Sequence, residues 1–241
     1  MTDQSMIDCA CVIHGTGYDW MYVDRLYNML QRNLQNRVRF HVYTEHSRPV
    51  PSHMIKHTLT EWPDISGPRR SWWYKLQLFN TEHHSDNLLY FDLDTVIVRD
   101  ISWIPKLTTD KFWAIRDFKH LQVPGFSGIN SSVMWWNVSK YHYVWQDFSR
   151  ANIDQIIREN TQGDQQYIGR IIGHNNIRFF NEGLIQSWRW QAHDGGMDFS
   201  TRLHRQPGAG TKLDPRTSVL VFHGRPKPHE ISDVVIKQHW K

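Results

Sequence analysis

The chain has 241 residues, of which 39% are hydrophobic and 22% are charged, and this composition is typical of a globular protein. The net charge of +4 and the lack of a dense Lys/Arg block argue against a nucleic-acid partner, although a modest positive charge suits an anionic small substrate. No apolar run reaches the roughly 20 residues of a membrane span, and Met1–Asp8 does not resemble a signal peptide. We therefore expect a soluble cytoplasmic protein with one domain over residues 1–241.

The cysteine and tryptophan residues add two expectations. Cys9 and Cys11 alternate on an apparent strand, so they share one face and are predicted to be buried and unbridged, in a reducing compartment. The count of twelve Trp residues is high. Most are assigned to the core, but flat aromatic rings also stack on sugars, so some are candidates for a carbohydrate site.

Apolar runs and helical spacing divide the first hundred residues into alternating elements. The run 7–14 ends in Gly15-Thr16-Gly17, which is typical of a buried strand followed by a turn. The polar, proline-bearing stretch 44–68 is predicted to be a long loop with one short element. Further strands are expected at 38–43, 87–92 and 95–98, and helices at 18–34 and 71–79, the second with Ser71 as its N-cap.

The same alternation continues to the end of the chain. Strands are expected at 112–116, 129–137 and 219–223, and helices at 140–150, 152–160, 164–172 and 231–238. Strands that alternate with helices predict an α/β domain with a largely parallel sheet. Ligands of such sheets bind beyond the carboxyl ends of the strands, where Asp92 and His223 are both expected.

The acidic pair Asp92-Leu93-Asp94 follows the clearest buried strand in the sequence. If the backbone stays extended, the two carboxylates point the same way, and two like charges so close need a positive partner. A hard divalent cation supplies that charge and can also bridge to phosphate groups. The alternative is an acidic turn or a helix cap, which is common for isolated Asp-x-Asp strings, so the pair alone does not define the function.

Two other classes of protein remain open at this point. Haloacid-dehalogenase phosphatases also place Asp-x-Asp after an apolar strand. In those enzymes it follows the first strand, near the N-terminus, whereas about ninety residues precede the acidic pair in this chain. These phosphatases also need a later acidic pair to bind magnesium. Gly163-Asp164 begins a string of that kind here, but Ile168 occupies the position of the second Asp. A carbohydrate-binding module with a structural cation would use the Trp residues and the acidic pair.

A second polar loop follows the late strand. Its sequence His223-Gly224-Arg225-Pro226-Lys227-Pro228, downstream of Asp-x-Asp, resembles the His-Gly-x-x-Lys-Pro signature of the GT-A glycosyltransferases related to glycogenin and the bacterial lipopolysaccharide galactosyltransferases, family 8. The resemblance extends in patches over 7–228. It implies a single GT-A domain with a mixed, mainly parallel sheet flanked by helices, in which about 7–100 binds the nucleotide and about 101–241 binds the sugar and the acceptor.

The resemblance implies that Asp92, Asp94 and His223 are metal ligands and that Lys227 contacts the donor diphosphate. An imidazole in the ligand set suits manganese somewhat better than magnesium. Gly224 would let the backbone approach the phosphates closely. Without the acidic pair, His223 would be interpreted as an ordinary hydrogen-bonded histidine at the end of a strand.

Two internal segments resemble the sugar-binding segments of the same family. Asn130, Ser131 and Ser132 match the segment that lines the donor-sugar pocket, with two Ser residues in place of its Ala-Gly pair. Asp164 and Gln165 match the Asp-Gln segment beside the anomeric carbon, which implies a catalytic role in binding sugar hydroxyls, orienting the acceptor or stabilising developing charge. Asp164 is also a candidate N-cap of the helix that follows.

The resemblance implies nucleotide contacts at the end of the first strand and inside the acidic pair. The residues concerned are Ile13, His14, Gly15, Thr16 and Leu93. Lys75 lies where the family often has a basic residue that reaches the donor, and a solvated lysine on an amphipathic helix is an equal alternative. Arg69 and Arg70 could draw in the donor, although paired arginines are usually solvated surface.

Trp188 and Trp190 are candidates for the acceptor site, because the stretch 187–194 tends to face the acceptor in this fold. Two Trp residues at alternate positions of a strand would share one face that is suited to stacking on a sugar. The alternative is that at least one of them is buried in a core strand. The resemblance thus implies a metal-dependent enzyme, with Mn²⁺ or Mg²⁺, that transfers a sugar from a UDP-sugar to a carbohydrate or other hydroxyl acceptor with retention of configuration.

Overall fold

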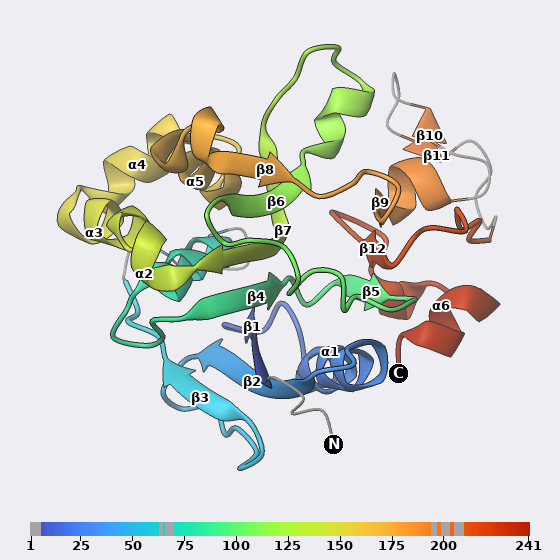
Figure 1. The fold of residues 1–241 in the computed structure, drawn as a ribbon, viewed down its shortest axis with the longest axis horizontal. Coiled ribbons are helices and arrows are strands. Elements are labelled where there is room, and N and C mark those ends of the chain that lie inside the picture. The colour runs from blue at the N-terminus through green and yellow to red at the C-terminus, as the bar shows by residue number, and fades with distance from the viewer. Residues whose placement is uncertain (1–5, 63–64, 66–69, 194–196, 199–202, 205–209) are drawn as a thin grey trace.

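The computed structural model describes residues 6–62, 65, 70–193, 197–198, 203–204 and 210–241. Among the residues considered above, Met1–Ser5, Arg69 and Asp194 lie outside these ranges. The described part consists of a large mixed sheet, a small sheet beside it and helices on both sides (Figure 1). The predicted α/β class is therefore confirmed.

Seven strands form the large sheet, in the order β3-β2-β1-β4-β7-β6-β8. The first four strands in this order run parallel, β7 is antiparallel to both of its neighbours, and β8 is parallel to β6. The expected mixed, mainly parallel sheet is thus present. The strands are β1 Met6–Val12, β2 Arg37–Thr44, β3 Ile55–Thr58, β4 Asn87–Phe91, β6 Phe112–Arg116, β7 Ile129–Asn137 and β8 Ile177–Phe179.

A three-stranded sheet, β5-β12-β9, joins distant parts of the chain. Its strands are β5 Thr95–Ile97, β12 Val219–Val221 and β9 Ile185–Ser187. Separately, β10 Met197–Asp198 pairs antiparallel with β11 Leu203–His204. Because β12 is antiparallel to β5, the end of β12 lies beside the start of β5, and the Phe222 amide donates to the Asp94 carbonyl at 3.1 Å. This register brings the late His-Gly loop to the acidic pair.

The helices follow the predicted order, with some changes at their ends. The α-helices are α1 Trp20–Asn33, α2 Val138–Tyr141, α3 Tyr143–Arg150, α4 Ile153–Glu159, α5 Asp164–Ile172 and α6 Val234–His239. Short 3₁₀ turns lie at Phe118–Leu121, His174–Asn176 and Pro228–Glu230. The segment Ser71–Phe79 is helical as expected, but it is a 3₁₀ helix, and Ser71 is its first residue rather than a capping residue.

Capping explains where two helices begin. The Asp19 side chain accepts from the Met21 amide at 2.9 Å, so α1 begins at Trp20 rather than at residue 18. The Asp233 side chain accepts from the Ile236 amide at 2.9 Å, and the last helix therefore starts three residues later than predicted. The predicted helix 140–150 is two helices that meet at His142.

The described residues form two hydrophobic cores, one on each face of the large sheet. One core lies between the sheet, α1, α6 and the small sheet, and it contains Cys9 and Cys11, which are both buried and free as predicted. The other lies under the 3₁₀ helix 71–79 and helices α2 to α5. Trp136 is fully buried there, and its ring lies 5.0 Å from that of Phe79. Several of the twelve Trp residues thus belong to the core, as expected.

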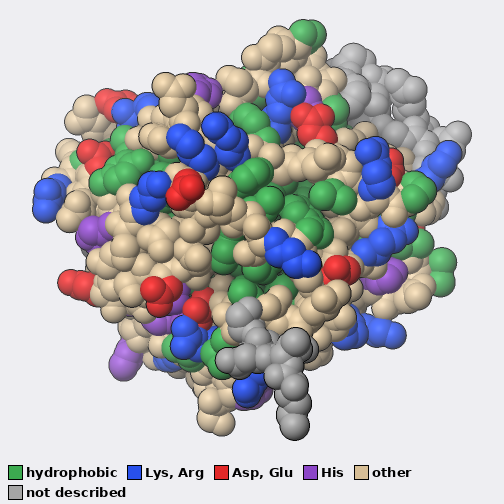
Figure 2. All heavy atoms as spheres, in the orientation of Figure 1, with side chains coloured by type: hydrophobic (Ala, Val, Ile, Leu, Met, Phe, Trp, Pro, Cys, Tyr) green, Lys and Arg blue, Asp and Glu red, His purple; other side chains and the backbone are tan. Residues whose placement is uncertain are grey.

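The face of the molecule in Figure 2 shows basic and acidic side chains interspersed around an apolar middle region. Across the described ranges, the helices are too short or too polar to cross a lipid bilayer.

Candidate active site

The candidate site lies at the carboxyl ends of β1 and β4. The pairing of Ala10 with Tyr90 sets the register of these two parallel strands, so their ends lie side by side. The Asp92 amide, directly after β4, donates to the Ser132 carbonyl of β7 at 2.8 Å. The acidic pair, the nucleotide segment and the donor-sugar segment therefore meet at one edge of the sheet, as the α/β interpretation predicts.

The acidic pair itself is a turn and not an extended segment. The Thr95 amide and hydroxyl donate to the Asp92 carbonyl at 3.2 and 2.8 Å, which closes a tight turn over Leu93 and Asp94. The extended conformation assumed from the sequence is therefore wrong. A different lysine pairs with each carboxylate, since Lys75 contacts Asp92 and Lys227 contacts Asp94.

Lys75 is central to an interior polar network. It is 4% exposed, and its Nζ lies 2.9 Å from Asp92 Oδ1, 3.2 Å from Asp164 Oδ2 and 2.9 Å from Ser131 Oγ. Burial alone would raise the pKa of Asp92, but Lys75 and the Tyr90 hydroxyl, which donates at 2.6 Å, hold it below its usual value. A solvated lysine, one of the two alternatives from the sequence, is wrong because this side chain lies under the 3₁₀ helix.

Asp94 lies in a different electrostatic setting. Its carboxylate accepts from the Tyr18 hydroxyl at 2.9 Å and from the Lys227 ammonium, which also lies 5.3 Å from the centre of the Tyr18 ring. Burial and the neighbouring Asp92 raise the pKa of Asp94, against the opposite effect of Lys227. Asp94 is thus a buried carboxylate whose negative charge is incompletely compensated.

Asp164 is the first residue of α5, after Gly163, which has the positive φ of 83° that favours glycine. Its side chain does not cap the helix, because it accepts from the Ser131 hydroxyl at 2.7 Å and pairs with Lys75. Two predicted segments, the serines of β7 and the start of α5, are therefore joined directly. Asn130 is buried beside them and accepts from the Ser132 amide at 3.0 Å.

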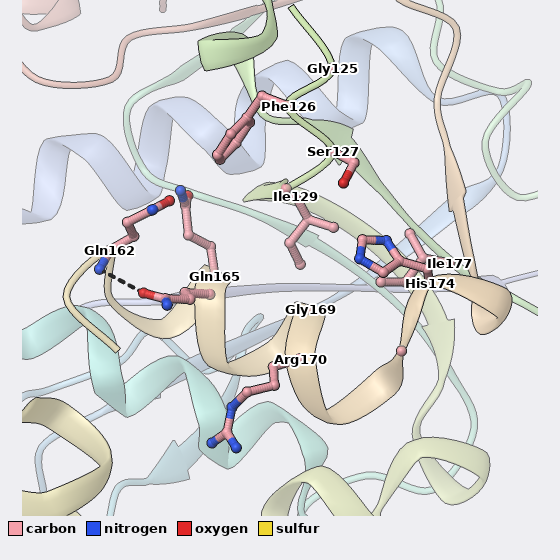
Figure 3. Close-up of a pocket in the computed structure, with 13 residues that line it drawn as sticks. Gly125, Phe126, Ser127, Ile129, Gln162, Gln165, Gly169, Arg170, His174 and Ile177 are labelled. Atoms are coloured by element: carbon pink, nitrogen blue, oxygen red, sulfur yellow. Dashed lines mark hydrogen bonds between the residues drawn. The ribbon is translucent and has the colours of Figure 1, made fainter. Parts of the chain in front are cut away.

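Gln165, the second candidate catalytic residue, points away from the Lys75 network. Its Nε2 donates to Asp117 Oδ2 at 2.8 Å, and burial raises the pKa of Asp117. Gln165 also lines a pocket of about 530 Å³ between α5 and the loop before β7 (Figure 3). Phe126 and Ile129 lie on the side of the pocket opposite Gln162 and Gln165 in this view.

His223 follows β12 and is held on several sides. Its Nε2 lies 2.6 Å from Ser187 Oγ, and its ring centre lies 5.4 Å from that of Phe118 and 4.6 Å from that of Trp190. Burial, together with nearby cationic groups, lowers the pKa of His223 to about 4, so the imidazole is neutral at neutral pH. Gly224 has φ of 76°, a conformation that an L side chain would strain.

The three predicted metal ligands are not drawn together as tightly as a coordination shell. Over the described ranges, one group of three His, Cys, Asp or Glu residues has its ligand atoms within 4.8 Å of one another, and it is a different one, formed by Asp8, His41 and His84. In the candidate site, Lys227 and Ser187 occupy the atoms of Asp94 and His223 that a cation would use.

The predicted nucleotide segment lies at the end of β1. Ile13 is buried, and its amide donates to the Tyr43 carbonyl at 2.9 Å, while the side chain of Leu93 is also in the core. His14 Nε2 lies 2.9 Å from Glu61 Oε1. The Gly15 carbonyl accepts from Arg48 at 2.6 Å, and Thr16 is exposed. The side chains of Ile13 and Leu93 are therefore closed to a ligand, which could contact these two residues only through their backbone groups.

The predicted strand around the acceptor candidates is wrong. Trp188–Ala192 form a single π-helical turn, in which the Ser187 side chain accepts from the Trp190 amide at 3.1 Å. Trp188 is 2% exposed and its ring stacks on Phe222 at 5.0 Å, so it offers no face to a sugar. Trp190 is half-buried against His223. The two rings do not form the shared aromatic face expected of a strand.

Four polar residues of the site were missed in the sequence. They are Tyr18 on Asp94, Tyr90 on Asp92, Asp117 on Gln165 and Ser187 on His223. Tyr90 lies two residues before Asp92 on a strand, so the period of two could have placed it on the same face as Asp92. The other three come from segments far away in the sequence, and no local pattern indicates their contacts.

No protein-family model matches the sequence, and no curated protein matches it. The structure is similar to that of an active-site mutant of LgtC, with 14% identity, a TM-score of 0.65 and coverage of 96% of this chain and 93% of that chain. It is also similar to the glycosyltransferase GlyE of Streptococcus pneumoniae, with 14% identity, a TM-score of 0.63 and coverage of 95% of this chain and 58% of that chain. A third similar structure is mouse xyloside xylosyltransferase 1, with 11% identity, a TM-score of 0.55 and coverage of 92% of this chain and 100% of that chain. The chain therefore has the GT-A fold that these glycosyltransferases share.

Proposed function

We propose that the protein is a metal-dependent glycosyltransferase that moves a sugar from a nucleoside diphosphate sugar, UDP-sugar by family resemblance, to a hydroxyl acceptor with retention of configuration. The observation that carries the proposal is the meeting of Asp92, Asp94 and Lys227 at the carboxyl ends of β4 and β12. The transferase fold and the neighbouring structure of LgtC in complex with donor and acceptor sugar analogues support it.

The protein groups have distinct roles in this proposal. Lys227 supplies positive charge to the departing diphosphate, where negative charge develops. Asp164 and the serines of β7 bind sugar hydroxyls, because their oxygens face the same network as Lys75. Gln165 lies one residue further on and borders the 530 Å³ pocket, which supports a role for it between the donor sugar and an acceptor.

Asp92, Asp94 and His223 would hold a divalent cation, Mn²⁺ or Mg²⁺, whose charge would neutralise the two phosphates. The donor set fits such an ion, because it combines two carboxylates with an imidazole that is neutral at neutral pH. The incompletely compensated charge of Asp94 also fits, since a cation would satisfy it more fully than Lys227 does.

The phosphatase alternative finds no support in the topology. Its Asp-x-Asp would follow β1, but residues 13–17 come after that strand and contain no carboxylate, and Asp92 follows β4. A binding module without catalysis would leave Lys227 and the Lys75 network without a substrate group to serve.

Release of free nucleotide tests the proposal. The protein is incubated with a panel of nucleotide sugars, with and without Mn²⁺, and with the Asp94→Ala variant as the matched control. We expect metal-dependent release from at least one donor and its loss in the variant. Absence of metal-dependent release with every donor, or full release by Asp94→Ala, would overturn the transferase function. An aspartyl-phosphate intermediate would instead indicate a phosphatase.

Replacing Ser187 by alanine is expected to tighten Mn²⁺ binding by about fivefold, because the Ser187 hydroxyl occupies the His223 nitrogen that a cation would use, and a hydrogen bond is worth about 1 kcal/mol. Isothermal titration of Mn²⁺ into the protein with bound nucleoside diphosphate measures the change. Ser149→Ala, an exposed serine of α3, is the control and should bind as the wild type does. Equal affinity of Ser187→Ala and this control would show that Ser187 does not compete with the cation for His223.

The pocket in Figure 3 is proposed to receive the acceptor, because its apolar wall faces Gln162 and Gln165. Phe126→Ala should raise the KM for the acceptor by about tenfold, since an aromatic contact is worth about 1.5 kcal/mol, and leave donor hydrolysis unchanged. Steady-state kinetics with varied acceptor measure this. Leu121→Ala, on the same loop and 37% exposed, should have wild-type KM. A fall in donor hydrolysis with Phe126→Ala would place the pocket at the donor instead.

A further inference from the structure

A second polar cluster lies outside the candidate active site and has no role in the proposed reaction. Asp8 of β1, His41 of β2 and His84 of the loop before β4 are each between 4% and 9% exposed. His41 Nε2 lies 2.7 Å from Asp8 Oδ1, and His84 Nε2 lies 3.9 Å from Asp8 Oδ2. A carboxylate and two imidazoles are thus gathered in the interior, where ionisable groups are rare unless they are paired or bind a metal.

This cluster is separate from the acidic pair. His84 precedes the amino end of β4, whereas Asp92 follows its carboxyl end. A five-residue strand spans about 16 Å. A cation at His84 therefore cannot be the one proposed at Asp92 and Asp94, and the two positions lie at opposite ends of the same strand.

The hydrogen bonds around the cluster resemble the outer shell of a metal site. His41 Nδ1 lies 2.8 Å from His57 Nε2. In the tautomer that donates Nδ1–H to His57, the Nε2 atom of His41 carries a lone pair directed at Asp8 and His84. Metal-bound histidines commonly donate their other ring N–H to such a partner, which fixes both the tautomer and the ring orientation.

Arg39 neutralises Asp8 when no cation is bound. It pairs with both carboxylate oxygens of Asp8, and its side chain is 44% exposed. A side chain that is exposed to this extent can turn into solvent when a bound cation takes over the neutralisation of Asp8. Arg39 is therefore a reversible competitor for Asp8 and not a fixed part of the core.

We propose that Asp8, His41 and His84 form a second divalent-cation site, selective for zinc. The three ligand atoms lie within 4.8 Å of one another, against about 3.3 Å between ligands of a tetrahedral zinc ion, so small side-chain movements complete the site. Two nitrogen ligands favour zinc over magnesium, calcium or manganese. Three protein ligands leave the fourth position to water.

Zinc retention tests the site independently of transferase activity. The full chain with Asp94→Ala, which disables the other cation position, is stripped with chelator, loaded with zinc, desalted and analysed for metal content. We expect one zinc per chain, its loss when His84→Gln is added, and its retention with the exposed control His46→Gln. No retained zinc, or equal zinc with and without His84→Gln, would overturn the proposal.

Arg39→Ala provides a second test that keeps all three ligands, so it remains informative if His84→Gln does not fold. Without the competing guanidinium, zinc should bind on the order of tenfold more tightly. Zinc at 100 times its Kd should raise the Tm of this variant by about 5–10 °C. If Arg39→Ala lowers the Tm and zinc does not restore it, the cluster is an ion-pair network and the zinc proposal is wrong.

Discussion

Replacing Lys75 by methionine is expected to lower the free energy of unfolding by about 3–5 kcal/mol at neutral pH. The methionine fills a similar volume, but it leaves the carboxylates of Asp92 and Asp164 facing each other in the interior without their common cation. Urea unfolding followed by tryptophan fluorescence measures the change. Lys106→Met, at an exposed position, is the matched control and should change stability by less than about 0.5 kcal/mol.

The pH dependence separates this charge effect from a packing effect. In the wild type, the pKa of Asp92 is lowered, so its contribution to stability is present above the usual pKa and is lost as the pH falls through the lowered value. In Lys75→Met, burial without the lysine raises that pKa, so the penalty disappears once acid protonates the carboxyl group. The stability gap between variant and wild type should therefore narrow on acidification. A gap that does not change with pH would mean that packing, not charge, causes the loss.

Replacing Lys227 by glutamine is expected to change two measurements in opposite directions. The kcat/KM for sugar transfer should fall by about 10²- to 10³-fold, because a positive group at the leaving diphosphate is lost. Binding of Mn²⁺ in the absence of donor should tighten, because Lys227 no longer competes for Asp94. Steady-state kinetics and metal titration test the two parts.

Lys227→Arg and Lys237→Gln are the controls for this pair of measurements. Arginine keeps the positive charge but not the compact ammonium group, so Lys227→Arg should retain part of the activity. Its affinity for Mn²⁺ should stay close to that of the wild type, below that of Lys227→Gln. Lys237 lies on α6 and is exposed, so Lys237→Gln should behave as the wild type does. Loss of activity without tighter metal binding would show that Lys227 does not compete with the cation.

Local patterns predicted most of the elements. The helix 164–172 was placed correctly because its apolar residues repeat at helical spacing after Gly163. Alternation misled the prediction at 188–192, since Trp188 and Trp190 alternate like strand residues but belong to a π-helical turn. The side chain of Ser187 caps that turn and also holds His223, and alternation carries no information about either contact.

The candidate site could be predicted only in part, because its residues are joined by contacts between distant segments. Lys75 was identified as a basic residue near the donor, but its burial between Asp92 and Asp164 depends on how the 3₁₀ helix packs on β7. Tyr18 was predicted to begin a helix and instead lies before α1, with its hydroxyl on Asp94. These contacts follow from the tertiary arrangement and leave no periodic signal in the sequence.

The pairing of β5 with β12 has a consequence for how the protein becomes active during synthesis. Val96 and Leu220 are partners in this pairing, although the chain between them forms most of the rest of the fold. A chain still on the ribosome can pair β1 with β4, but its acidic pair lacks His223 and Lys227, and its first core lacks the buried side chains of β12. If the proposed function is correct, a nascent chain in which β12 has not yet paired with β5 would not transfer sugar from the donor.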